Sequence, residues 1–280
     1  MNTQMSLVRG LRRLLTIYLP LALILFVMLL PFYWMAVTSV KSYPEMFNLK
    51  ANPFWPTAAT FDHYVELFTK TRFPLWLRNS MYVSVVSTAI SMVISVLAGY
   101  SLSRLRFRGS TLIGLVTFVT YLVPTTLLFI PMAEVTRNLH LLGKTEALIA
   151  VYPTFQVPFC TWLLMGYFRS IPADLEECAM VDGATRWLAL RKIILPLAIP
   201  GVITAGIFSF TLSWNEFIYS LVLVSAEAKR TIPVGVLTRL VAGDLYFWGP
   251  LMAAALIGSV PVAVLYAFFV EQYVAGLTAG

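Results

Sequence analysis

Four polar or aromatic residues lie close together in an otherwise apolar stretch of this sequence. Glu216 is the single charged residue between positions 199 and 225, and Trp214, Asn215 and Tyr219 lie beside it. Rings stack on the apolar faces of sugars and amides bind their hydroxyls, so this group suits a sugar pathway. It is also consistent with a carboxylate near the outer interface that is wetted, or paired across an interface with another subunit, and binds no ligand. No nucleophile lies beside a candidate base, so we expect no enzyme.

A second motif, Gly143-Lys144-Thr145, resembles the end of a phosphate-binding loop. The first glycine of that loop would stand at position 138, which is Asn138, and no strand-like segment precedes the motif. We therefore expect no cofactor on this chain. The two histidines, His63 and His140, fall in different loops and predict no metal site.

The composition indicates which solvent surrounds these residues. Of the 280 residues, 59% are hydrophobic and 12% are charged, whereas soluble domains carry roughly 25% charged residues. Lipid is therefore the expected surrounding. The net charge of +7 fits contact with anionic headgroups. The basic residues are scattered between apolar runs and form no stripe, which argues against nucleic acid as a partner.

Six apolar runs are long enough to cross a bilayer as helices. They do not alternate as the strands of a membrane barrel do, so we predict an all-α bundle of six transmembrane helices. The first run is too long for a cleavable signal and should remain as an anchor. Cys160 in one run and Cys178 in a loop are expected to be free thiols. The runs are 14–40, 80–102, 111–132, 147–168, 199–225 and 248–270.

The placement of Lys and Arg favours one orientation. The basic residues divide equally between the two sides, but on one side they stand in tighter links near the ends of the runs: Arg9, Arg12, Arg13, Arg104, Arg106, Arg108, Arg169, Arg186, Arg191 and Lys192. We therefore expect cytoplasmic tails at 1–13 and 271–280. An external loop at 41–79 then separates the first helix from a core domain at 80–270.

The external loop contains the pattern of an amphipathic helix. Phe61, Tyr64, Val65 and Phe68 are spaced to share one face, and Thr60 is a candidate N-cap. Such a face could dock an external partner. It could equally lie on lipid headgroups, with its aromatic residues at the interface.

The loop at 169–198 carries the signals of two short helices. Pro172 suits a first helical turn, acidic residues follow it, and Gly183 can adopt the left-handed conformation that ends a helix. Thr185 can cap a second helix, which Pro196 should halt. Two surface helices fixed to membrane helices would transmit motion if a partner gripped them. The alternative is a folded loop that only covers the end of the bundle.

This loop resembles the EAA loop of ATP-binding-cassette (ABC) importer permeases, whose pattern is E-A-A-x3-G-x9-I-x-L-P. The spacing matches throughout, with cysteine where the second position is usually alanine, and Leu190 where many relatives have phenylalanine. Nearly the whole chain is similar to the second permease subunit of maltose-type importers in the carbohydrate-uptake class. The matching loop residues are Glu177, Cys178, Ala179, Asp182, Gly183, Ala184, Ile193, Leu195 and Pro196.

The resemblance implies the transmembrane domain of a type I ABC importer, in a bacterial or archaeal plasma or inner membrane. It implies a homologous permease as partner, an external substrate-binding protein, and two ATPase subunits that hold ATP and Mg. Glu177 and the Asp182-Gly183-Ala184 turn would then touch an ATPase subunit. The expected cargo is a mono- or oligosaccharide.

Two alternatives remain. A permease of this kind could carry a non-sugar solute such as glycerol 3-phosphate or an amino acid. A secondary carrier would need coupling-ion groups at mid-membrane and typically inverted repeats. The sequence offers only Glu216 at depth and no repeat.

Overall fold

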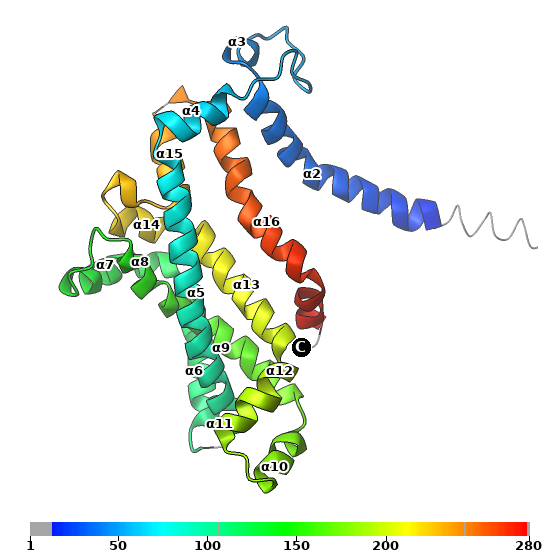
Figure 1. Ribbon diagram of the computed structural model, residues 1–280, viewed down its shortest axis with the longest axis vertical. Coiled ribbons are helices and arrows are strands. Elements are labelled where there is room, and N and C mark those ends of the chain that lie inside the picture. The colour runs from blue at the N-terminus through cyan, green and yellow to red at the C-terminus, as the bar shows by residue number, and fades with distance from the viewer. Residues whose placement is uncertain (1–12, 106, 244, 279–280) are drawn as a thin grey trace, which may run out of the picture. The chain divides into compact units, whose positions relative to one another are not determined.

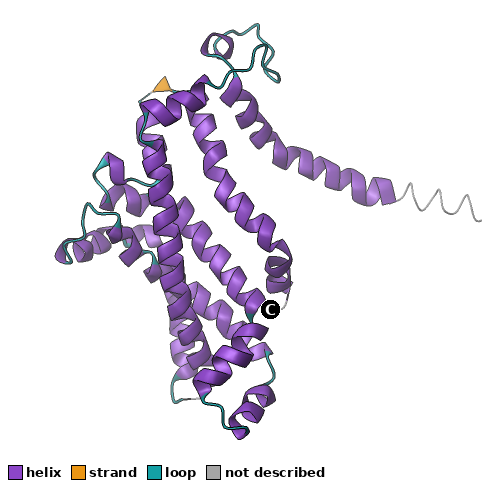
Figure 2. Cartoon of the chain, viewed as in Figure 1, coloured by secondary structure: helices purple, strands orange, loops and turns teal. Residues whose placement is uncertain are grey.

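The computed structural model describes residues 13–105, 107–243 and 245–278, which are almost entirely helical (Figures 1 and 2). The all-α prediction is confirmed. The chain divides into two compact units, which are described separately. Unit 1 comprises residues 1–71 and 239–259, and unit 2 comprises residues 72–238 and 260–280. Arg106 and most of the predicted tail at 1–13 lie outside the described residues.

Four helices of the described residues are long and apolar enough to cross a membrane, or five if one bent pair counts as a single span. The predicted run 111–132 accounts for the difference from six, because it is divided in the structure. It forms α6 (Ser110–Tyr121), the 3-10 turn η2 (Thr125–Leu127) and the start of α7 (Phe129–Asn138). Pro124 lacks an N–H and disfavours helix at the residue before it, which explains the break.

Unit 1 contains the first membrane helix. The π-helical turn η1 (Leu14–Tyr18) continues into α2 (Leu19–Val40), and every side chain from residue 13 to residue 34 is exposed. A helix that is apolar on all faces is expected to be surrounded by lipid or by another apolar chain. The unit also contains α3 (Tyr43–Met46), α4 (Asp62–Lys70), β1 (Val241–Ala242), β2 (Leu245–Tyr246) and the start of α16 (Trp248–Thr278).

The predicted amphipathic helix is α4, and it buries the face opposite to the aromatic one. His63 and Leu67 are buried, whereas Phe61, Val65 and Phe68 are exposed. The His63 ring packs on the backbone of Gly249, and its Nε2 lies 2.6 Å from the carbonyl oxygen of Lys41. The exposed aromatic face remains consistent with a docked partner or with lipid.

The predicted cap of α4 lies one residue too early. The N-cap position is Phe61, and the hydroxyl of Thr60 accepts a hydrogen bond of 3.2 Å from the N–H of Asp62. A bond between distant parts of the loop also holds this helix. The hydroxyl of Tyr43 donates to Glu66 over 3.1 Å, and burial together with that carboxylate raises the pKa of Tyr43 to about 12.

Unit 2 is a helical bundle built around α5 (Phe73–Arg104), α9 (Pro153–Ser170) and α13 (Ile199–Asn215). The helix α5 packs on both others, and α6 packs on α9 (Figure 1). Small side chains spaced three or four residues apart let these helices approach closely. Those on α5 are the buried residues Ser80, Ser84, Ser87, Ser91, Ser95 and Gly99.

Hydrogen bonds cross this helix interface at its centre. Ser91 Oγ donates to Gln156 Oε1 over 2.6 Å, and Ser87 Oγ lies 2.9 Å from Ser213 Oγ. All four side chains are buried. The amide of Gln156 also donates to Ser213, so α5, α9 and α13 share one polar network.

The remaining helices of unit 2 differ from the predicted ranges at their ends. The predicted run 199–225 is interrupted at residues 216–217, where α13 ends and α14 (Ile218–Leu223) begins. The helix α8 (Glu146–Val151) precedes α9, and the 3-10 turn η4 (Glu227–Lys229) and α15 (Ile232–Leu240) follow α14. The helix α16 reaches residue 278 with a kink at Phe269, where φ is −119° and ψ is 18°, so the predicted tail at 271–280 is helical as far as it is described.

Candidate functional site

The loop 169–198 forms the two helices that its sequence predicts. The first is α10 (Ala173–Val181), and the second is α11 (Arg186–Ala189), which the hydroxyl of Thr185 caps by accepting 3.3 Å from the N–H of Leu188. Pro172 is the N-cap of α10 and not part of its first turn, one residue before the predicted position. We refer to residues 173–189 as the elbow.

Gly183 closes the elbow as predicted. Its φ is +88°, a conformation that costs a residue with a side chain about 1 kcal/mol or more. The N–H of Gly183 donates to the carbonyl of Met180 over 3.1 Å, and the N–H of Ala184 donates to that of Ala179 over 2.9 Å. These two bonds form a Schellman motif, which satisfies the last carbonyls of α10.

The second arm continues past the predicted stop at Pro196. It runs through the π-helical turn η3 (Leu190–Ile194) and α12 (Leu195–Leu197) to Ala198, where the chain bends by 80° into α13. In the wider π turn the N–H of Leu195 donates to the carbonyl of Leu190. The chain therefore carries Pro196 inside its last turn, and the break falls two residues later.

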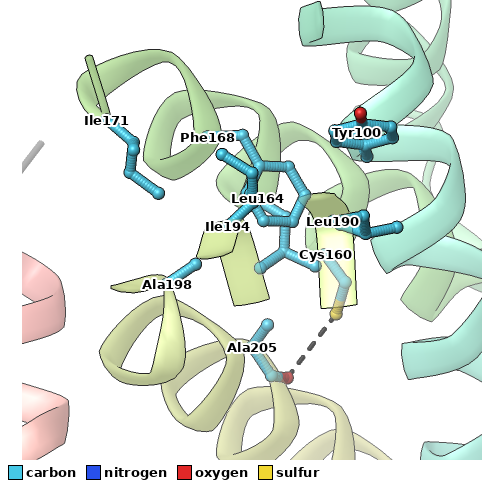
Figure 3. Close-up of a cluster of buried hydrophobic side chains, with 9 residues drawn as sticks. All are labelled: Tyr100, Cys160, Leu164, Phe168, Ile171, Leu190, Ile194, Ala198 and Ala205. Carbon is cyan, nitrogen blue, oxygen red and sulfur yellow. Dashed lines mark hydrogen bonds between the residues drawn. The ribbon is translucent and has the colours of Figure 1, made fainter. Parts of the chain in front are cut away.

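Apolar side chains anchor this arm to the bundle. Leu190 and Ile194 are buried against Leu164 and Phe168 of α9, in a cluster that also includes Tyr100 (Figure 3). Burial of a leucine or isoleucine side chain contributes about 1.5–3 kcal/mol. Of the motif residues here, Ile193 and Leu195 are half-buried and Pro196 is exposed.

The outer face of the elbow is open. Glu177, Cys178 and Asp182 are exposed, and so are the large apolar side chains Val181 and Trp187. Ala179 and Ala184 are half-buried at the turn. The predicted motif residues from 177 to 184 thus lie together at one end of the unit 2 bundle (Figure 1). Both cysteines are free thiols, as predicted, with Cys160 buried and Cys178 exposed.

Sequence reasoning missed two residues that hold the inner face of the elbow. The hydroxyl of Tyr100, near the end of α5, donates to the buried carboxylate of Glu176. Arg104 donates to the carbonyls of Phe168 and Ile171, where α9 ends. A tyrosine and an arginine one turn apart share a helix face, and their position at the end of an apolar run was the signal available in the sequence.

The second predicted group lies mostly around one cavity. Asn215, Glu216 and Tyr219 line a cavity of about 750 Å³ together with residues of α6, α9, α13 and α16. The aromatic lining includes Tyr121, Phe155, Phe208 and Tyr266. Trp214 does not line it, because its buried ring stacks on Phe210 at 5.6 Å.

The carboxylate of Glu216 is fully engaged within the chain. It accepts hydrogen bonds from the hydroxyl of Tyr152 at 2.9 Å, from the N–H of Tyr219 at 2.8 Å and from the N–H of Ser220 at 3.1 Å. The two backbone donors belong to the first turn of α14, so Glu216 caps this helix. These three donors belong to this chain and not to a second subunit, and through them Glu216 shapes the cavity wall by holding α14 in place.

The side chains that could bind a metal lie apart in the described part of the chain. Among the described residues, no three His, Cys, Asp or Glu side chains are grouped as a metal site requires. The motif at 143–145 lies between α7 and α8, where Gly143 donates to the carbonyl of Leu223 over 2.8 Å. The elbow offers an exposed surface to which a partner protein could bind. The cavity is large enough to hold a small ligand.

Comparison with known proteins identifies the family. Residues 77–277 match the family described as binding-protein-dependent transport system inner membrane component. The chain belongs to this family. The matched region contains the elbow, the residues that line the cavity, α9, α13 and all but the first turn of α5.

Named relatives and solved structures agree with this membership. The chain is 42% identical over 253 residues to the sulfoquinovosyl glycerol transport system permease protein SmoH of Agrobacterium fabrum, covering 90% of this chain and 88% of SmoH. It is 33% identical over 255 residues to the trehalose/maltose transport system permease protein MalG of Thermococcus litoralis, covering 90% of each. A bacterial ABC transporter involved in alginate import shares the fold, with a TM-score of 0.79 over 91% of this chain and 94% of the other at 23% identity.

Family membership confirms the resemblance read from the sequence. The chain is an inner membrane component of a binding-protein-dependent importer of the ABC class. It is a transport component and not an enzyme. The placement of the two termini in the cytoplasm stays a prediction.

Proposed function

We propose that this chain is the permease subunit that forms one half of a sugar pathway, with a homologous permease as the other half. SmoH and MalG are named for the transport of sulfoquinovosyl glycerol and of trehalose/maltose, which supports a sugar or a sugar glycoside as the cargo. The observation that carries the proposal is the ring-lined cavity beside Asn215 and Tyr219.

The chemistry of this cavity favours a sugar over the alternatives. Its volume of about 750 Å³ lies within the range of about 300–1,000 Å³ for small-molecule sites. Aromatic rings offer stacking surfaces, and the amide of Asn215 offers a polar partner. No lysine or arginine of the described chain lines the cavity, so a phosphate such as glycerol 3-phosphate would lack a counter-charge.

We further propose that the elbow contacts a separate ATPase subunit. The exposed residues Glu177 and Asp182 supply charge for such an interface, and the neighbouring Val181 and Trp187 supply apolar area. Two ATPase subunits would hold ATP and Mg, and their closure would displace the elbow. ATP can drive this change only by binding the closed state more tightly than the open one.

Transport by the complete importer tests the sugar assignment. The importer would be reconstituted in proteoliposomes with its binding protein and ATP, and offered trehalose, maltose and a glycosyl glycerol beside glycerol 3-phosphate and an amino acid. We expect saturable uptake of at least one sugar or glycoside. Uptake of glycerol 3-phosphate or the amino acid alone would contradict the assignment.

A pair of tyrosine variants tests the cavity in the same assay. Tyr121 lines the cavity, whereas Tyr82 is exposed on α5 and does not. The Tyr121→Ala variant loses one stacking ring, and its uptake should fall about fivefold, since such a contact contributes about 1 kcal/mol. Tyr82→Ala should transport normally. Equal uptake by the two variants would remove the cavity from the pathway.

A further inference from the structure

The hydroxyl of one tyrosine on α5 lies within hydrogen-bond distance of both arms of the elbow. The hydroxyl of Tyr100 donates to the Oε1 of Glu176 in α10 and lies 3.4 Å from the carbonyl oxygen of Arg186, which opens α11. The ring of Tyr100 also packs edge-on against Phe168 of α9, with centroids 6.4 Å apart. A single buried side chain therefore touches α5, α9 and the two helices on either side of Gly183.

The Glu176 carboxylate faces Tyr100 in the interior of the bundle and does not face solvent. Its side chain is 5% exposed, whereas the next residue, Glu177, is exposed. A buried carboxylate is costly unless it is hydrogen-bonded, so the bond from Tyr100 stabilises the seating of α10. The two neighbouring acids thus face opposite ways, one into the bundle and one outward.

Arg104 fixes the hinge point next to this bond. It lies one turn after Tyr100 on α5, and it donates to the carbonyls of Phe168 and Ile171. These carbonyls close the C-terminal end of α9, where a cation is favoured by the helix dipole. The chain between α9 and α10 is therefore held at one end by Arg104 and at the other by Tyr100.

We propose that the Tyr100–Glu176 bond is the positioning contact through which movement of the elbow reaches α5. Force applied to the outer face of α10 passes to Glu176, then to the Tyr100 hydroxyl, and so to a helix that packs on both α9 and α13. The apolar contacts of Leu190 and Ile194 hold the second arm to α9, whereas the polar contact of Tyr100 holds α10. The inference rests on the proposed function, because it requires an ATPase that grips the elbow.

Matched variants of the reconstituted importer test this contact. Tyr100→Phe removes the hydroxyl and keeps the ring. Glu176→Leu removes the acceptor, whereas Glu176→Gln keeps an oxygen that can accept the same bond. Tyr82→Phe removes a hydroxyl from an exposed position on the same helix and is the control. The measured quantity is sugar transported per ATP hydrolysed.

The expected result is uncoupling without loss of assembly. Tyr100→Phe and Glu176→Leu should lower the transport-to-hydrolysis ratio about tenfold, the effect of one lost hydrogen bond to a charged partner, and combining them should add little. Glu176→Gln and Tyr82→Phe should stay near the wild-type ratio. ATP hydrolysis in the uncoupled variants should remain at or above the wild-type rate.

Two results would overturn the proposal. One is an assembled Tyr100→Phe importer with a wild-type ratio, and the other is a Glu176→Gln importer as defective as Glu176→Leu. If Tyr100→Phe does not assemble, the comparison of Glu176→Gln with Glu176→Leu is enough to test the proposal. Failure of the proposed function is distinguishable, because the wild-type importer would then show no ATP-dependent sugar uptake at all.

Discussion

The hydroxyl of Tyr152 donates a hydrogen bond of 2.9 Å to the carboxylate of Glu216, which in turn accepts two N–H bonds from the first turn of α14. Tyr152 is fully buried and immediately precedes α9. The bond therefore ties the start of one bundle helix to the cap of another. Glu216, the single charged residue in the predicted run 199–225, therefore stabilises the fold beside the cavity.

Replacement of Glu216 should therefore lower the stability of the folded subunit. Glu216→Ala removes the cap and leaves the Tyr152 hydroxyl buried without its partner, which should cost about 1–3 kcal/mol. Glu216→Gln keeps an acceptor oxygen and should lose less. Thermal unfolding of the purified subunit complex in detergent measures both. Equal melting temperatures for the two variants would contradict the capping role.

Two glycines of α13 should respond differently to alanine. A Cβ on Gly201 would lie 2.4 Å from the Tyr167 ring, whereas a Cβ on Gly206 would meet no atom of the described part of the chain within 4 Å. Gly201→Ala should destabilise the bundle by about 1–3 kcal/mol through overpacking. Gly206→Ala should be neutral or stabilising, because alanine favours helix by about 1 kcal/mol. The same melting assay measures both variants. A lower melting temperature for Gly206→Ala than for Gly201→Ala would mean that α13 does not pack on this tyrosine.

The serine stripe of α5 offers a second matched pair. Ser91 Oγ donates to Gln156, whereas Ser84 Oγ is buried with no hydrogen-bond partner among the described residues. Ser91→Ala should cost about 0.6–1 kcal/mol, the usual range for bonds between membrane helices. Ser84→Ala should cost nothing or stabilise slightly. Chemical unfolding in detergent would measure the difference, and the prediction fails if Ser84→Ala proves the more harmful change.

Gly183 should tolerate few substitutions. Asparagine adopts φ near +88° more readily than other side chains, so Gly183→Asn should retain most uptake. Gly183→Pro cannot adopt this φ and also loses the N–H bond to Met180, so the elbow should not close. We expect Gly183→Pro to insert at normal levels and to uncouple ATP hydrolysis from uptake. Normal uptake by this variant would argue strongly against an elbow that transmits force.

The elbow was largely predictable from sequence because its signals are local. Gly183 and Thr185 act within a few residues of themselves, through backbone conformation and capping, and both predictions are confirmed. Pro172 and Pro196 were placed one or two residues wrongly. The cause at Pro196 is the π turn, which changes the hydrogen-bond register and which hydropathy cannot reveal.

Contacts across the bundle could not be derived in the same way. The bond from Tyr100 to Glu176 joins residues 76 positions apart, and the one from Ser91 to Gln156 joins residues 65 apart. Spacing along the chain indicates which residues share a face but not which helix that face meets. The interruption at Glu216 was missed for a similar reason. Hydropathy predicts one span for an apolar run, whether or not a carboxylate caps a second helix within it.

The accessibility of Cys178 tests the central claim most directly. This thiol is exposed on the outer face of the elbow, whereas Cys160 is buried and should stay unreactive. Intact and inverted membrane vesicles would be treated with a membrane-impermeant maleimide, with and without the ATPase subunits, and labelling of this chain would be measured beside a Cys178→Ser control. We predict labelling from the cytoplasmic side alone, and its suppression when the ATPase is bound. Labelling from the external side, or unchanged labelling in the presence of the ATPase, would contradict the account.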